Sequence, residues 1–141
     1  MKPEYTDRLL QTVSASAARN ANDAETALHA VYAAIVQGRF DVFGESVTDD
    51  VEMSISGFGP MNGNWRGRSA VVAATQRNFS LVSAQEPEVE GMISQGDSVA
   101  VLLRESGVFK STGDVYRVRA VQWFTFIDGK IKRMDQVVAS V

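Results

Sequence analysis

The charged residue in the most unusual setting is Arg104, which lies inside the apolar run AVLLRESGV. A guanidinium group in such a run needs a carboxylate, a cluster of carbonyls or water close by. Glu105 is adjacent in sequence, but neighbouring residues of a strand point to opposite faces. We therefore expect Arg104 to form the polar end of a binding site, with Glu105 on the other side of the strand.

Metal and cofactor chemistry has few residues to draw on. The chain has a single histidine, His29, and no cysteine, and its carboxylates are scattered. A closed zinc site cannot be built from that set of ligands. No Ser/His/Asp set, phosphate-binding loop or EF-hand motif occurs either. We expect no bound metal and no cofactor.

The composition indicates one globular domain over residues 1–141. Hydrophobic residues make up 45% of the chain and charged residues 22%, which is close to the globular average. The net charge is −3 without a basic stripe, so we expect no nucleic-acid partner. No apolar run is long enough to span a membrane, and the first twenty residues lack the apolar core of a signal peptide. Together with the absence of cysteine, this predicts a cytoplasmic protein.

Helical periodicity covers the first half of the chain. Residues 1–20 predict a helical extension that precedes the domain. Asn22 and Glu25 form a capping box for a second helix, which ends at Gly38. A short helical turn follows in RFDVFGESV, then a half-buried strand over 51–55, a loop (GFGPMNGNWRG) and a further helix over about 69–81.

The second half has the pattern of strands. Four segments rich in β-branched and aromatic residues are separated by turns at 96–97, 112–113 and 128–129, which predicts an antiparallel meander. Helices followed by a meander indicate an α+β fold with the helices on one face of the sheet. The strand VYRVRAVQWFTFI is apolar on both faces, and Arg117 and Arg119 lie at the rim of the second. We therefore predict a homodimer formed through the outer face of the sheet.

Three segments carry a family resemblance: AAIVQGRFDVFGESVTDDVEM, NWRGRSAVVA and FTFIDGKIKRMDQV. They resemble the NTF2-like superfamily, in particular its SnoaL-like and ketosteroid-isomerase-like branches, and together they span residues 24–140. The resemblance implies a cone-shaped fold with curved antiparallel sheet, N-terminal helices packed on it and a pocket between them. It also implies dimerisation through the outer sheet face. It implies no particular reaction, because this fold hosts isomerases, cyclases, hydrolases and non-catalytic binders.

Ketosteroid isomerases use a carboxylate base with a tyrosine and a protonated acid. Carried onto this chain, the base falls on Ile55, the tyrosine on Val31, next to Tyr32, and the protonated acid near Gln122. Because Ile55 cannot accept a proton, the resemblance argues against steroid-type isomerisation.

Limonene epoxide hydrolases place Arg-x-Asp on a middle strand and another aspartate on the last. The first motif resembles Arg104-Glu105-Ser106, and the final aspartate falls on Gln136. Since Ser106 and Gln136 supply neither the base nor the acid of an epoxide hydrolase, this chemistry is also disfavoured.

SnoaL-like cyclases use one strand carboxylate, for which Asp135 is the candidate. A two-residue turn at Asp128-Gly129 would put Asp135 on the face of Gln122. A three-residue loop with a glycine bulge would put Gln136 there instead. We favour the second arrangement. A three-residue loop at 112–114 would likewise place Arg104 opposite Gln122.

The sequence thus predicts a SnoaL-like protein that binds a small, largely apolar molecule bearing oxygen. It would act without a cofactor as an isomerase, cyclase or hydrolase-type enzyme. The alternative is a non-catalytic ligand-binding or dimerisation module that lacks the acid and base residues of the family. The predicted pocket consists of Tyr32, Phe40, Phe43, Trp65, Arg104, Ser106, Gln122, Met134 and Gln136.

Overall fold

A computed structural model describes residues 23–141. The predicted helical extension over residues 1–20 lies outside the described residues. The chain runs through α2 (Asp23–Val36), α3 (Phe40–Glu45), β1 (Val47–Ser56), a 3-10 turn (Gly59–Met61), β2 (Gly63–Arg66) and α4 (Arg68–Ser80). The long strands β3 (Val82–Gln95), β4 (Ser98–Phe109), β5 (Val115–Ile127) and β6 (Lys130–Ser140) follow. None of the helices in this part of the chain is long and apolar enough to cross a membrane.

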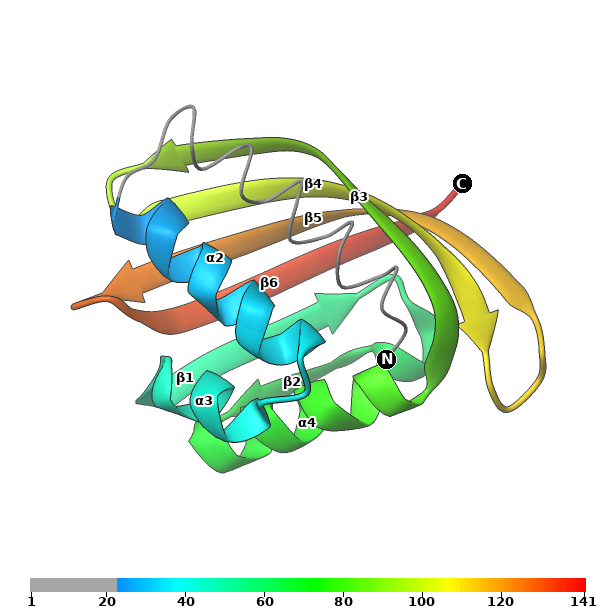
Figure 1. Ribbon diagram of the computed structural model, residues 1–141, viewed down its shortest axis with the longest axis horizontal. Coiled ribbons are helices and arrows are strands. Elements are labelled where there is room, and N and C mark those ends of the chain that lie inside the picture. Colours follow the sequence, from blue (N-terminus) through cyan, green and yellow to red (C-terminus); the bar gives the residue numbers. More distant parts are fainter. Residues whose placement is uncertain (1–22) are drawn as a thin grey trace.

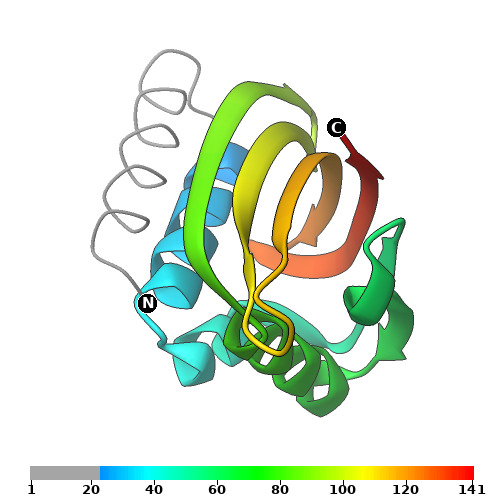
Figure 2. The same cartoon turned by 90° about the vertical axis from the view of Figure 1, so that its right-hand side faces the viewer.

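The six strands form one open, mixed sheet in the order β2-β1-β6-β5-β4-β3. Strands β3 to β6 are the predicted antiparallel meander, and β1 joins its last strand in parallel. Figure 1 shows α2 lying across the sheet and α3 and α4 beside β1 and β2. Figure 2 shows how strongly the long strands curve around the side that carries the helices. The predicted α+β cone is confirmed.

Alternation along the strands explains which face is covered. In β5, the side chains of Tyr116, Val118, Ala120, Phe124 and Phe126 are buried, whereas every intervening residue except Gln122 and Thr125 is exposed. Phe124 and Phe126 pack in the main core with apolar residues of the helices. Tyr116, Val118 and Ala120 form a second cluster with Met61, Val82 and Val138. Helix α2 ends where predicted, because Gly38 takes a left-handed conformation (φ +73°) and the Arg39 amide returns to the Ala34 carbonyl at 2.8 Å.

The predicted loop before α4 contains a strand that the sequence pattern did not indicate. Residues 63–66 pair with β1 as β2, with Trp65 opposite Met53. The motif Gly-Asn-Trp-Arg is short and rich in turn formers, so its pairing depends on the edge that β1 offers rather than on its own propensity.

The last hairpin differs from the predicted one. Asp128 and Gly129 both have positive φ and Ile127 pairs with Lys130, which is a two-residue turn and not a three-residue loop. An irregularity follows between Thr125 and Phe126, where β6 has one extra residue. Because of that extra residue, Gln136 lies opposite Gln122, on the face where the three-residue loop was expected to put it.

Candidate functional site

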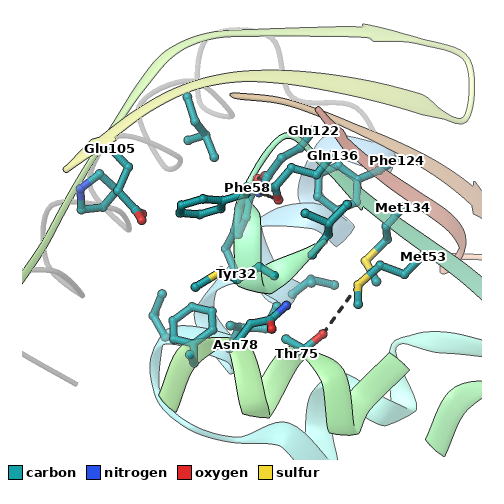
Figure 3. Close-up of a pocket in the computed structure, with 18 of the residues that line it drawn as sticks. Tyr32, Met53, Phe58, Thr75, Asn78, Glu105, Gln122, Phe124, Met134 and Gln136 are labelled. Atoms are coloured by element: carbon teal, nitrogen blue, oxygen red, sulfur yellow. Dashed lines mark hydrogen bonds between the residues drawn. The ribbon is translucent and has the colours of Figure 1, made fainter. Parts of the chain in front are cut away.

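A cavity of about 180 Å³ lies between the helices and the inner face of the sheet. Its walls are mainly apolar and come from α2, α3, α4, β1, the 3-10 turn and β3 to β6. An engineered cavity of roughly 150 Å³ admits benzene, so this cavity is large enough for one six-membered ring with a short substituent. Figure 3 shows polar groups at several points of an otherwise apolar wall. The principal apolar residues are Val31, Ile35, Phe43, Met53, Phe58 and Phe79.

One polar group of the cavity is a chain of three side chains. The hydroxyl of Tyr32 on α2 donates to Oε1 of Gln122, and Nε2 of Gln122 donates to Oε1 of Gln136 at 3.0 Å. Burial raises the pKa of Tyr32 far above its ordinary range, so the phenol keeps its proton and acts as a donor. Tyr32 donates to Gln122 and Gln122 donates to Gln136, so Nε2 of Gln136 is the last donor of this series of hydrogen bonds. Among the described residues no acceptor binds that atom, so it can donate to a ligand.

The second polar group is a carboxyl on β4. Glu105 lines the cavity, and Tyr116 of β5 donates its hydroxyl to Oε2 of Glu105 at 2.5 Å. Desolvation raises the pKa of Glu105, and the hydrogen bond from Tyr116 lowers it by a smaller amount. The net result is a carboxyl that holds its proton more tightly than usual, inside a cavity, which is a frequent property of acid–base residues.

A glycine and two aromatic rings hold Tyr116 in place. A Cβ on Gly107 would lie only 2.5 Å from the Tyr116 hydroxyl and 2.6 Å from Cζ, so the ring occupies the space of the missing side chain. Phe58 and Phe109 pack on that ring with centroid distances of 5.3 and 5.0 Å. The tyrosine is thereby directed along β4 toward Glu105.

Five of the predicted pocket residues line the cavity: Tyr32, Phe43, Gln122, Met134 and Gln136. Phe40 lies behind the wall, where its ring packs edge-on against Phe79 at 6.3 Å. Trp65 is half-buried on β2 and covers the edge of the core. Ser106 lies on the same face of β4 as Arg104, away from the cavity.

The expected position of Arg104 is wrong. Its Cα partner across β5 is Arg119, not Gln122, and its guanidinium lies on the outer face, 3.7 Å from Glu90. The cause is the connection over residues 110–114, which is longer than the assumed three-residue loop and reverses the parity of the strand. The same change of parity turns Glu105 into the cavity, so the predicted faces of Arg104 and Glu105 are both wrong.

Asp135, the predicted weak catalytic candidate, borders the cavity but is directed outward. It lies opposite Trp123, whose side chain is 42% exposed, whereas Gln136 lies opposite Gln122. Its carboxylate accepts from Ser54 at 2.5 Å and pairs with Arg133 at 2.8 Å. These contacts make it part of a surface ion network with Glu52.

Glu105 and Asn78 are two polar cavity residues that the sequence reasoning missed. Glu105 had a signal, since Val99, Val101 and Leu103 set an inward parity that continues to position 105, but the apolar residues between them obscured it. Asn78 is buried on α4 and follows Val71 and Ala74 on the inner face of the helix. Within residues 23–141, no group of three or more acidic, histidine or cysteine side chains could hold a metal ion.

Comparison with known proteins places the chain among small α+β domains of this shape. An NTF2-like protein from Burkholderia xenovorans is 23% identical, with a TM-score of 0.73 over 82% of this chain and 88% of the other. An LEH-like epoxide hydrolase from M. tuberculosis is 18% identical, with a TM-score of 0.66 over 82% of each chain.

A third solved structure is that of TerC, co-crystallised with polyporic acid. It is 20% identical, with a TM-score of 0.67 over 82% of this chain and 90% of the other. Comparison with curated proteins gives no significant match. The model of the SnoaL-like domain matches residues 28–134, which is most of the chain, and the protein therefore belongs to the SnoaL-like domain family.

Proposed function

We propose that this protein is a cofactor-independent enzyme that transfers a proton on a small, largely apolar molecule bearing oxygen. The observation that supports this most strongly is Glu105, an acid inside the cavity whose pKa is raised by desolvation. A carboxylate with a raised pKa is a stronger base than an exposed one, and its protonated form can then return the proton to the substrate.

The other end of the cavity supplies recognition. Nε2 of Gln136 donates to an oxygen of the ligand, and the Tyr32–Gln122 chain fixes the direction of that amide. Gln122 lies opposite Val101, four residues from Glu105, so the two groups stand roughly 13 Å apart along the sheet at 3.3 Å per residue. That separation is between backbone positions, and the side chains of Glu105 and Gln136 line the same cavity. In a conjugated ligand, the charge left by proton removal near Glu105 spreads to the oxygen held by Gln136.

The named relatives are compatible with this reaction class. An LEH-like epoxide hydrolase shares the fold, and TerC was co-crystallised with polyporic acid. Neither defines the substrate of this chain. Cyclohex-2-enone is a suitable probe, because its size suits the cavity and its C4 hydrogens lie across the ring from the carbonyl.

The experiment follows exchange of C4–H for deuterium in D2O by NMR. In the wild-type protein, Glu105 removes a proton from C4 and returns a deuteron, so the signal decays. Glu105→Gln is expected to lose this exchange, whereas Asp135→Asn, a matched control on the outer face, keeps it. Exchange that survives in Glu105→Gln would refute the assignment. Binding of the enone without exchange would instead favour the non-catalytic binding module.

We also propose that the protein forms a homodimer through the outer face of β5 and β6. Val121, Trp123 and Val137 are 45%, 42% and 62% exposed there, which leaves an apolar patch on the sheet. Arg119 lies to one side of the patch and Asp135 to the other. A two-fold axis through the patch would bring the apolar residues of one copy against the same residues of the other.

A further inference from the structure

Asn78 is a polar residue in a position that favours an apolar one. It lies on the inner face of α4, is only 8% exposed and lines the cavity. Asparagine has a low helix propensity, and a buried amide with an unmet hydrogen bond is destabilising. Figure 3 shows the side chain projecting from α4 into the cavity near Thr75.

Contacts with neighbouring residues fix the orientation of the amide. Nη1 of Arg77 lies 3.3 Å from Oδ1 of Asn78, and because a guanidinium can only donate, that atom must be the oxygen. The nitrogen Nδ2 is then the other atom of the amide. Among the described residues, none accepts a hydrogen bond from Nδ2. Thr75, one turn earlier, donates its hydroxyl proton to the Val71 carbonyl at 2.9 Å.

We infer that Asn78 is a second hydrogen-bonding anchor for the ligand, which therefore carries two acceptor oxygens, one for Gln136 and one for Asn78. The two donors reach the cavity from different walls, Gln136 from the sheet and Asn78 from α4. The ligand class is thus narrower than a simple ketone. It is a small apolar ring or chain with a carbonyl and a second ether, carbonyl or hydroxyl oxygen.

This inference rests on the proposed use of the cavity, but its test measures binding alone. The probes are 2-, 3- and 4-methoxycyclohexanone, each compared with the ethylcyclohexanone of the same shape. The methoxy oxygen can only accept a hydrogen bond, so any gain over the ethyl compound reports a protein donor. Affinity is measured by titration calorimetry or ligand-observed NMR.

For the wild-type protein, at least one methoxy isomer is expected to bind roughly three- to tenfold more tightly than its ethyl partner. Asn78→Leu removes the donor at nearly the same volume and should abolish that gain while leaving the ethyl compound within about twofold. Asn78→Asp, which keeps the size and replaces donors by acceptors, should abolish it too. Gln136→Leu should weaken both compounds by a similar factor, since each has the carbonyl.

The inference is overturned if no methoxy isomer exceeds its ethyl partner in the wild-type protein, which includes the case in which none binds. It is equally overturned if the gain persists in Asn78→Leu. A failure of the proton-transfer function has a different signature, because the methoxy gain would then be present while deuterium exchange of the enone is absent.

Discussion

Replacing Gly107 by alanine is a sharp test of how Glu105 is held in the cavity. The added Cβ would lie 2.5 Å from the Tyr116 hydroxyl oxygen, 2.6 Å from Cζ and 2.7 Å from Cε1. These contacts involve a ring packed between Phe58 and Phe109 and not the end of a flexible chain. The ring must therefore move, and the hydrogen bond from its hydroxyl to Glu105 is lost.

The expected cost combines two losses and one gain. Overpacking costs about 1–3 kcal/mol and the lost hydrogen bond about 1 kcal/mol. Alanine recovers about 0.4–1 kcal/mol by restricting the unfolded chain. The net loss of unfolding free energy is about 1–3 kcal/mol, which should lower the urea midpoint by about 1 M. Loss of the Tyr116 hydrogen bond should also raise the pKa of Glu105 further, because that bond favours the ionised form.

Two comparisons separate this mechanism from a general intolerance of alanine in the sheet. Gly91→Ala on β3 is the matched control, since a Cβ there meets no atom within 4 Å, and it should leave stability unchanged or slightly raised. In a Tyr116→Leu background the Gly107→Ala cost should fall close to zero, because the clashing ring is gone. If Gly107→Ala costs the same in both backgrounds, the ring is not the cause and the reasoning is wrong.

Two further predictions concern charge and assembly. The raised pKa of Glu105 means that the folded state binds more protons than the unfolded state between pH 4.5 and that raised value, so wild-type stability should fall as pH rises through this window. Glu105→Gln should lack this slope in urea titrations at several pH values, and equal slopes would contradict the enclosed acid. For assembly, sedimentation should give a dimer that buries on the order of 1,200–2,000 Å². Trp123→Glu should convert it to a monomer, whereas a wild-type monomer at micromolar concentration would rule the interface out.

The elements that sequence reasoning placed well are those with strong local signals. The end of helix α2 was set by Gly38, and the meander by its Gly-containing turns. Strand β2 had no such signal, because its pairing with β1 is a tertiary contact. The inward position of Gln136 was expected for the wrong reason. The loop is a two-residue turn, and an irregularity further along β6 supplies the extra residue that sets the register.

Arg104 and Glu105 lie on the opposite faces of β4 from those predicted, which shows why the site was harder to predict from the sequence than the fold. A strand alternates with a period of two, so a change of one residue in the loop over 110–114 exchanges the inner and outer faces of β4. The apolar residues of AVLLRESGV occupy both parities and cannot decide between the two registers.

The cost of desolvation decides between the two registers of β4. In the observed register, Arg104 lies on the outer face, where its side chain is 53% exposed and paired with Glu90. Glu105 lies on the inner face, where it accepts a hydrogen bond from Tyr116. A guanidinium in the cavity would need a carboxylate partner there, whereas a carboxyl group can become neutral by taking up a proton. The register that buries the acid is thus the less costly one, and it turns a cavity expected to hold a fixed positive charge into one that can exchange a proton.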